Sequence, residues 1–208
     1  MGKASDFGFA GFFSFGSLFL EINCRKEKEM IYTTNYHSPI GSFLIAERDN
    51  ALIGIWMEGQ NRVLDSWKEE KMERVDSSVL KQAKEWLDCY FRGEKMEISS
   101  LPLAPEGSEF RKAVWKILCE IPYGQVTTYG TIAKRIAAER KLEHMSAQAV
   151  GGAVGHNPVS IIIPCHRVIG ADGSLTGYAG GIEKKIKLLQ LEGLEIKNGM
   201  VLYKKSSI

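Results

Sequence analysis

The chain has 208 residues, of which 44% are hydrophobic and 25% charged. These values are ordinary for a folded protein of one large domain or two small ones. The net charge of +2 excludes no class of partner by itself, but it is unevenly distributed. Residues 105–208 carry 14 basic and 9 acidic side chains, whereas residues 1–104 carry 13 basic and 16 acidic ones. The C-terminal half is therefore the better candidate for binding a polyanion.

The spacing of the cysteines and histidines matches neither a disulfide framework nor a zinc site. The chain has four of each, without a CxxC pair, which favours reduced thiols in an intracellular, cytoplasmic protein. No H-x3-H or HExxH spacing occurs, and Cys24 and His37 lie in or beside an atypical N-terminal stretch. We therefore expect no metal site and no cofactor.

The atypical stretch covers residues 1–29. Its segment Phe7–Ile22 is apolar and rich in Phe and Gly, but it is too short and too interrupted to span a bilayer. It also lacks a strongly basic start and an A-x-A-like cleavage site, so it does not match a signal peptide. We interpret residues 1–29 as an upstream extension, or a start codon assigned too early, and we expect no membrane partner.

The pattern that follows predicts a small α/β unit. Ile31–Met57 contains β-rich runs, with Asp49-Asn50 as the signal for a hairpin turn. Val79–Phe91 has apolar residues at helical spacing. Leu101–Pro105 is proline-bounded and predicts an extended connector. We accordingly divide the chain into a leader (1–29), an N-terminal domain (30–104) and a C-terminal domain (105–208).

The C-terminal domain begins with three predicted helices. Glu109–Glu120 is amphipathic, and Thr128 can cap a second helix that runs to about Ala138. Ser146 can cap a third helix, which ends near Gly155. This order fits a helix-turn-helix, although other helical bundles fit almost as well.

The third helix is unusually rich in small residues. Gly151 and Gly152 each destabilise a helix interior by about 1 kcal/mol relative to Ala. Gly152, together with Ala149, Ala153 and Gly155, predicts a smooth face that could approach a narrow groove closely. Tight packing against the protein core would require the same residues.

The segment Ile161–Gly170 reads IIIPCHRVIG and predicts a buried strand or extended run that leads into Cys165 and His166. Pro164 favours a rigid turn immediately before the thiol. A neighbouring imidazole or a bound water can remove the proton of a cysteine, and Glu192 is a candidate for orienting that imidazole. A Cys-His dipeptide alone is more often a buried thiol beside a satisfied polar neighbour.

The context of the dipeptide carries a specific resemblance. PCHRV within IIIPCHRVIG, preceded by Asn157-Pro158 and followed by Gly177-Tyr178, resembles the active-site signature of the O6-alkylguanine-DNA alkyltransferases. Similarity to that family extends from about Ser108 to Gly193, and Ile31–Met57 is similar to the start of its N-terminal domain. The resemblance implies an α+β protein with a ribonuclease H-like N-terminal α/β domain and a winged helix-turn-helix C-terminal domain.

The resemblance also assigns roles to individual residues. Cys165 matches the alkyl acceptor, His166 the imidazole that activates it through a water, and Glu192 the far end of that relay. Asn157 matches a residue that braces the turn before the active site, and Tyr129 one that rotates the target phosphate and donates toward the base. The remaining matches are Lys185, Tyr178, Ala179 and Gly180 around the guanine pocket and Thr128, Gln148, Ala149, Gly151, Gly152 and Ala153 in the DNA interface.

The function implied is DNA repair by stoichiometric, irreversible transfer of an alkyl group, methyl above all, from O6-alkylguanine to Cys165, with O4-alkylthymine as a further candidate substrate. The partner would be double-stranded DNA, bound through its minor groove by a monomer. The damaged nucleotide must be flipped out of the stack to be reached. Because the thioether product does not hydrolyse, each molecule would act once.

One position departs from the family pattern. An arginine commonly precedes the AVG run and replaces the flipped base in the stack, whereas this chain has Gln148. Glutamine has no charge and no guanidinium plane, which predicts a weaker or slower flip.

The sequence leaves three alternative functions open. A non-catalytic protein that flags alkylated DNA would share the fold but lack the cysteine. A cysteine hydrolase rarely uses adjacent residues as its dyad. A DNA-binding regulator would leave PCHRV without a purpose.

Overall fold

The structure is a computed structural model that describes residues 30–58 and 72–202. The expected leader at residues 1–29 lies outside the described residues. Within the described ranges, no helix is long and apolar enough to cross a bilayer.

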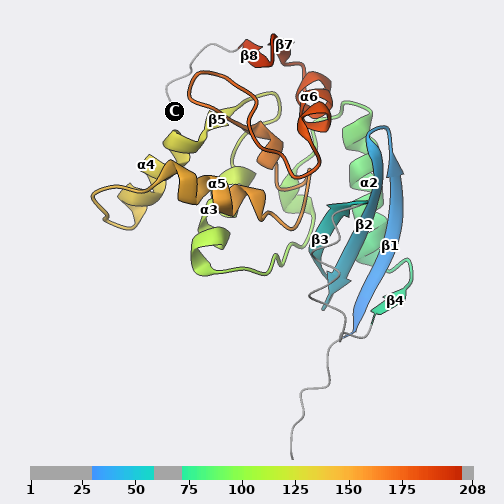
Figure 1. The fold of residues 1–208 in the computed structure, drawn as a ribbon. Coiled ribbons are helices and arrows are strands. Elements are labelled where there is room, and N and C mark those ends of the chain that lie inside the picture. Colours follow the sequence, from blue (N-terminus) through green and yellow to red (C-terminus); the bar gives the residue numbers. More distant parts are fainter. Residues whose placement is uncertain (1–29, 59–71, 203–208) are drawn as a thin grey trace, which may run out of the picture.

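A four-stranded sheet forms the N-terminal half (Figure 1). β1 (Ile31–Ser38), β2 (Gly41–Arg48) and β3 (Ala51–Met57) are consecutive antiparallel strands, and β4 (Met72–Arg74) pairs with β1 in parallel, giving the order β3-β2-β1-β4. Asp49 and Asn50 both have positive φ angles, of 53° and 58°, as a two-residue type I′ hairpin requires. The predicted hairpin is confirmed.

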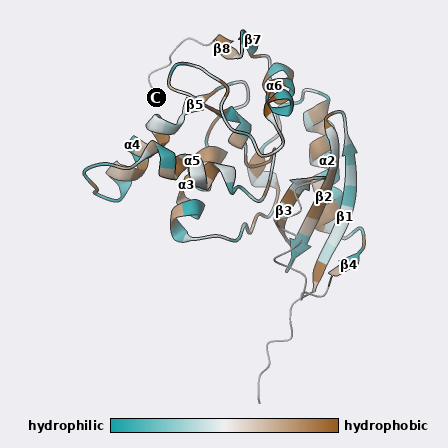
Figure 2. Cartoon of the chain, viewed as in Figure 1, coloured by the Kyte–Doolittle hydropathy of each residue, from teal (hydrophilic) through white to brown (hydrophobic). Residues whose placement is uncertain are grey.

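Helix α2 (Ser78–Phe91) covers one face of this sheet (Figure 1). Ser77 begins the helix by accepting a hydrogen bond from the backbone amide of Leu80. The buried side chains recur at helical spacing along the face that meets the sheet. Figure 2 shows apolar residues, in brown, along β3. A short 3-10 turn, η1 (Ile98–Ser100), follows.

The outer edge of β3 joins the two halves of the chain. The backbone of Leu52 exchanges hydrogen bonds of 2.8 Å with Pro102 and Ala104, which confirms the extended connector. Further along the strand, the amide of Ile55 donates to Pro158 at 2.8 Å, and its carbonyl accepts from Ser160 at 3.1 Å. One hydrophobic core consequently continues from the sheet and α2 into the C-terminal helices.

The C-terminal half begins with α3 (Glu109–Cys119), α4 (Tyr129–Glu139) and α5 (Ala147–Gly155), which pack against one another. Thr128 and Ser146 cap α4 and α5 as predicted, each accepting from backbone amides of the first turn. The indole Nε1 of Trp115 in α3 donates to the carbonyl of Ala153 in α5 at 2.9 Å. This buried bond fixes the small-residue helix against its neighbour.

The remaining elements complete a scaffold around the Cys-His segment. η2 (Cys165–Arg167) leads into β6 (Val168–Ile169). β6 pairs in parallel with β5 (Thr127–Thr128), the strand that directly precedes α4 in the chain. Helix α6 (Ile182–Leu191) follows, with Glu192 as its C-cap residue. The hairpin of β7 (Glu195–Lys197) and β8 (Met200–Leu202) closes the described part of the chain.

The expectation of a strand or extended run over Ile161–Ile163 is wrong. These residues form a turn in which Ile161 has a φ angle of 71° and the amide of Ile163 donates to the carbonyl of Val159 at 3.0 Å. All three side chains are nevertheless buried, as their apolar character predicted. Burial in the core has overridden the local β-propensity of the isoleucines.

Candidate active site

Cys165 lies at the start of η2, next to a pocket of about 160 Å³. Its side chain is only 6% exposed. The wall of this pocket is formed by residues of α4, α5, the turn that follows α5 and the loop before α6. The lining residues are Tyr129, Gly151, Val154, Gly155, Asn157, Ser160, Cys165, Gly177, Tyr178 and Ala179. The structure therefore brings together residues that the sequence placed in three separate segments.

Asn157 spans the turn that delivers the thiol. Its side-chain amide donates to the carbonyl of Ile163 at 2.8 Å, and its oxygen accepts from the amide of Val159 at 3.1 Å. These bonds stabilise a turn in which a β-branched residue has an unfavourable positive φ angle. The position of Cys165 thus depends on a side chain eight residues upstream.

The pKa of the Cys165 thiol is raised by burial. The side chain of Asn157, the ammonium group of Lys185 and the backbone amides of Cys165 and His166 act in the opposite direction without cancelling that effect. The resting thiol is consequently protonated near neutral pH, so nucleophilic chemistry requires a proton acceptor close by.

His166 is fully buried, and its Nε2 lies 2.7 Å from Oε1 of Glu192. An ionised carboxylate can only accept hydrogen bonds, so this contact assigns the ring proton to Nε2. Burial lowers the pKa of His166, against the opposing effect of Glu192, and the ring is therefore neutral at rest. Nδ1 then carries a free lone pair, and it has no hydrogen-bond partner among the described residues.

Glu192 is held as a carboxylate. Burial alone would raise its pKa, but the contacts with His166 and Arg167 outweigh burial and lower the pKa to about 2. The guanidinium of Arg167 donates to both carboxylate oxygens at 2.9 Å, and the amide of Gly124 donates to Oε2 at 3.1 Å. The charge of Glu192 is thus compensated before any reaction begins.

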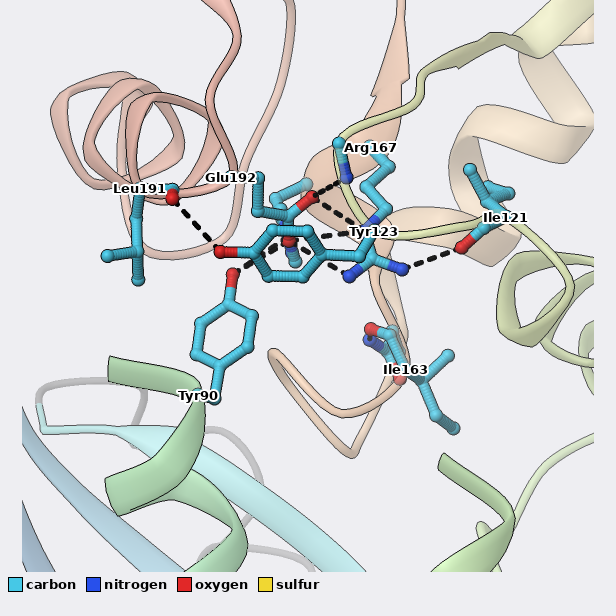
Figure 3. A network of polar contacts seen from close by, with 10 residues as sticks. Tyr90, Ile121, Tyr123, Ile163, Arg167, Leu191 and Glu192 are labelled. Carbon is cyan, nitrogen blue, oxygen red and sulfur yellow. Dashed lines mark hydrogen bonds and ion pairs between the residues drawn. The ribbon is translucent and has the colours of Figure 1, made fainter. Parts of the chain in front are cut away.

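Arg167 and Tyr90 are members of this network that sequence reasoning missed (Figure 3). Arg167 is buried, and its Nη1 also donates to the carbonyl of Ile121 at 2.6 Å. Its place beside His166 in an apolar decapeptide was a usable signal, because a buried arginine is almost always paired. Tyr90 gave no such signal, since its spacing in the helix marks it only as part of the buried face.

Lys185 is buried but is not among the residues that line the pocket. Its Nζ donates to the carbonyls of Val168 and Thr176 at 2.6 and 2.8 Å, which ties α6 to the loop before Tyr178. Burial lowers the pKa of Lys185 to about 8. The contacts of this side chain in the structure therefore support the loop.

Two tyrosines present hydroxyl groups near the pocket. The hydroxyl of Tyr129 donates to the carbonyl of Thr176 at 3.3 Å, and burial raises its pKa. The buried hydroxyl oxygen of Tyr178 has no hydrogen-bond partner in the part of the chain that the structure describes. Both groups remain protonated at neutral pH. The hydroxyl of Tyr178 is available as a donor to a molecule that enters the pocket, and that of Tyr129 becomes available once it turns away from the carbonyl of Thr176.

The expected DNA-contacting residues do not all share one surface. Gln148, Ala149 and Gly152 are exposed on α5, and Gly151 is half-buried against the ring of Tyr129. Ala153, by contrast, is buried at 3% exposure and holds Trp115 through its carbonyl, so it does not contribute to the exposed face.

Two further expected site residues also have structural contacts. The hydroxyl of Thr128 accepts from the amide of Thr131 at 3.1 Å as the cap of α4. Gly180 is absent from the pocket lining and packs against Met57 of β3, where a methyl group would collide with the methionine side chain.

Comparison with known proteins identifies the family. The model of the 6-O-methylguanine DNA methyltransferase ribonuclease-like domain matches residues 31–105, and that of the DNA binding domain of the same family matches residues 109–194. The chain belongs to the 6-O-methylguanine DNA methyltransferase family. Together the two models account for most of the chain, so the expected α+β architecture is confirmed.

Individual relatives agree with this assignment. The methylated-DNA–protein-cysteine methyltransferase of Methanosarcina acetivorans is 44% identical over 166 residues, covering 78% of this chain and 99% of the relative. That of Haemophilus influenzae is 42% identical over 162 residues, covering 78% and 86%. The crystal structure of the Mycobacterium tuberculosis O6-methylguanine methyltransferase superposes with a TM-score of 0.65 at 38% identity, covering 78% of this chain and 93% of that one. The Mycobacterium tuberculosis protein has also been solved in complex with DNA.

Family membership excludes two of the alternative functions. The helical C-terminal half matches the DNA binding domain of a methyltransferase family, so neither a cysteine hydrolase nor a simple DNA-binding regulator describes the chain. Cys165 and His166 lie within that matched domain, and Cys165 lines the pocket.

Proposed function

We propose that this protein repairs DNA by transferring the alkyl group of O6-alkylguanine to Sγ of Cys165, once per molecule. The observation that carries the proposal is the arrangement around η2. A protonated thiol borders a small pocket, and the next residue is a neutral imidazole whose Nε2 is bound to a buried carboxylate. Such an arrangement supplies a nucleophile together with the base that activates it.

The chemical step follows from the protonation states. The proton of Cys165 passes to Nδ1 of His166, directly or through one water molecule, and the thiolate attacks the alkyl carbon. The bond between that carbon and O6 breaks, and its electron pair stays with the guanine, which receives a proton from the hydroxyl of Tyr129. Solvent then takes up the proton held by Nδ1 of His166 and returns a proton to Tyr129, so the protons balance. The new thioether does not hydrolyse, so the protein is consumed.

The substrate is proposed to be duplex DNA, bound through the minor groove by a monomer. The exposed, small-residue face of α5 beside the pocket supports a close approach to a groove. A pocket of about 160 Å³ accommodates one base rather than a base pair, so the alkylated nucleotide must be flipped out of the stack. O4-alkylthymine is a second candidate for the same pocket.

The remaining proposals concern the organisation and setting of the protein. We place the domain boundary at residues 104–105, within the connector that pairs with β3. A cytoplasmic, reducing setting suits a reaction that consumes a thiol, and the described cysteines Cys89, Cys119 and Cys165 are all free. The residues named in the site suffice for the proposed transfer without a cofactor.

The test is the mass of the intact protein before and after incubation with a duplex carrying O6-methylguanine. We expect a gain of one methyl group on the wild type and none on Cys165→Ala. Cys119→Ala is the matched control, because Cys119 is another partly buried thiol of the C-terminal half, and it should still gain the methyl group. Binding of the duplex without any gain of mass would assign the protein to the class that only flags damage.

A further inference from the structure

We infer that Tyr90, a residue of the N-terminal domain, is a positioning residue for alkyl transfer. The inference rests on the proposed function and adds to it a contribution of the ribonuclease-like domain to the reacting centre. Tyr90 lies near the end of α2, and its hydroxyl reaches the contact between His166 and Glu192. Figure 3 shows its ring extending from α2 to the carboxylate that Arg167 approaches from the C-terminal domain.

The hydroxyl of Tyr90 completes a triangle of polar atoms. It donates to Oε1 of Glu192 at 2.8 Å, and its oxygen lies 3.3 Å from Nε2 of His166. The third side is the 2.7 Å contact between Nε2 and Oε1. The Nε2 proton therefore has two acceptors on one side of the ring, and a turned or flipped ring would lose both.

The ring of Tyr90 is fixed by its neighbours. It is 1% exposed and stacks on Trp86, with ring centroids 5.6 Å apart and an angle of 9° between the planes. Phe91 and Tyr123 contact it edge to face, at centroid distances of 5.5 and 6.1 Å. The hydroxyl is thus held in place before substrate arrives, as an effective supporting group must be.

The position of the hydroxyl determines what it contributes. By holding Nε2 toward Glu192, it keeps the lone pair of Nδ1 directed away from the carboxylate, where the proton of Cys165 is to be received. Its hydrogen bond to Glu192 also weakens the electrostatic attraction between that carboxylate and the imidazolium that forms during transfer. The other charged or titratable groups acting on His166 are Arg167 beside it in η2 and Lys185 in α6.

Replacement by phenylalanine separates this role from packing. Tyr90→Phe keeps the ring and its stacking contacts and removes only the hydroxyl. We expect the rate of methyl transfer at saturating DNA to fall about tenfold, the equivalent of one hydrogen bond to a charged group. The acid limb of the pH–rate profile should move to higher pH, because Glu192 then acts more strongly on His166 and raises its pKa. Affinity for the duplex, measured in the Cys165→Ala background, should not change.

Tyr36→Phe is the matched control. The hydroxyl of Tyr36 donates to Oδ1 of Asp88 at 2.8 Å, so this variant also removes a bond between a tyrosine and a carboxylate on α2, away from the site. We expect it to lower the melting temperature comparably while leaving the transfer rate and its pH profile unchanged. Equal rates and equal profiles for Tyr90→Phe and Tyr36→Phe would overturn the inference and reduce Tyr90 to a packing residue.

A second readout is independent of DNA repair. Carbamidomethylation of Cys165 by iodoacetamide, followed by peptide mass across a range of pH, reports thiolate formation directly. We expect Tyr90→Phe to shift this profile and Tyr36→Phe not to shift it. If the wild type failed to take up methyl from DNA while the iodoacetamide profile still shifted, the proposed function would fail and the positioning role would stand. With an unshifted profile and normal methyl uptake, the positioning role would fail and the proposed function would stand.

Discussion

The two sides of η2 differ in almost every physical respect. On one side, Cys165 borders a pocket lined by small residues, tyrosines and Asn157, with no ionised side chain in its wall. On the other side, His166 contacts a buried network in which Glu192 and Arg167 compensate each other's charge. The thiol and the imidazole are neighbours in sequence, yet they connect two different environments.

This difference indicates how the site divides its work. The pocket side must admit a base and release it, so it relies on shape and on neutral donors. The network side must hold a neutral imidazole, with its proton on Nε2, in one orientation. It therefore relies on fixed charges that need not move during the reaction. Changes on the network side should therefore affect chemistry and stability together, and changes in the pocket and on the exposed face of α5 should affect binding.

The largest effect is expected from Glu192→Gln. The variant leaves Arg167 buried without its carboxylate, which should lower the free energy of unfolding by about 3–5 kcal/mol. It also removes the partner that directs His166, so transfer should slow by about 100-fold or more. Urea unfolding and single-turnover mass measurements test both expectations. Glu139→Gln is the control, since its exposed pair with Arg135 should contribute less than about 0.5 kcal/mol.

The pH dependence of unfolding supplies a second readout for the same variant. The pKa of Glu192 is about 2 in the folded protein, against an ordinary value of 4.5. The ionised group therefore contributes its full stabilisation above pH 4.5, roughly 3 kcal/mol, and this stabilisation is lost as the pH falls toward 2. Glu192→Gln should flatten the stability curve in this window. An unchanged acid slope would show that other carboxyl groups carry the acid dependence.

A smaller effect is expected on the DNA-facing side from Gln148→Arg. Gln148 is exposed in the first turn of α5, so an arginine fits there without repacking. The added charge and planar guanidinium should raise affinity for the damaged duplex and the transfer rate by roughly three- to tenfold at low salt. Gln82→Arg, on the exposed side of α2, makes the same change of net charge away from α5 and should have no such effect. Equal behaviour of the two variants would remove Gln148 from the DNA interface.

The smallest effect is expected from Gly152→Ala. This variant should raise stability and lower affinity for DNA. Beyond the backbone of its own helix and its chain neighbours, a methyl group at Gly152 would meet no described atom within 4 Å, so it should stabilise α5 by about 0.5–1 kcal/mol. It would also project from the exposed face and weaken binding to duplex DNA about two- to fivefold if that face enters the groove. Thermal melting and fluorescence anisotropy measure the two quantities. Greater stability with unchanged affinity would place the groove contact elsewhere.

Sequence reasoning succeeded where the signal is local. The hairpin at Asp49-Asn50 and the caps at Thr128 and Ser146 depend on the conformations of adjacent residues, and the structure confirms them. Glu192 was one candidate partner for His166 from the residues alone, and the family resemblance was needed to select it, because no local rule joins residues 26 positions apart. In the structure, Nε2 of His166 lies 2.7 Å from Oε1 of Glu192.

Sequence reasoning failed where tertiary packing decides the outcome. Three β-branched residues at 161–163 predicted extended structure, but the bonds made by Asn157 stabilise a buried turn instead. Ala153 matched an exposed stripe in the sequence, although it is only 3% exposed in the structure. Tyr90 reaches the site only because the sheet and α2 pack against the other domain.

The outer edge of β3 has a further consequence for the behaviour of the chain. An exposed strand edge is a template for pairing between molecules and for aggregation. Here the backbone groups of Leu52 and Ile55 on that edge are occupied by Pro102, Ala104, Pro158 and Ser160. Residues that precede α3 in the chain and residues that follow α5 thus cover this edge of the sheet. Separating the two halves would uncover an apolar strand edge, so we expect the isolated N-terminal half to aggregate more readily than the whole chain.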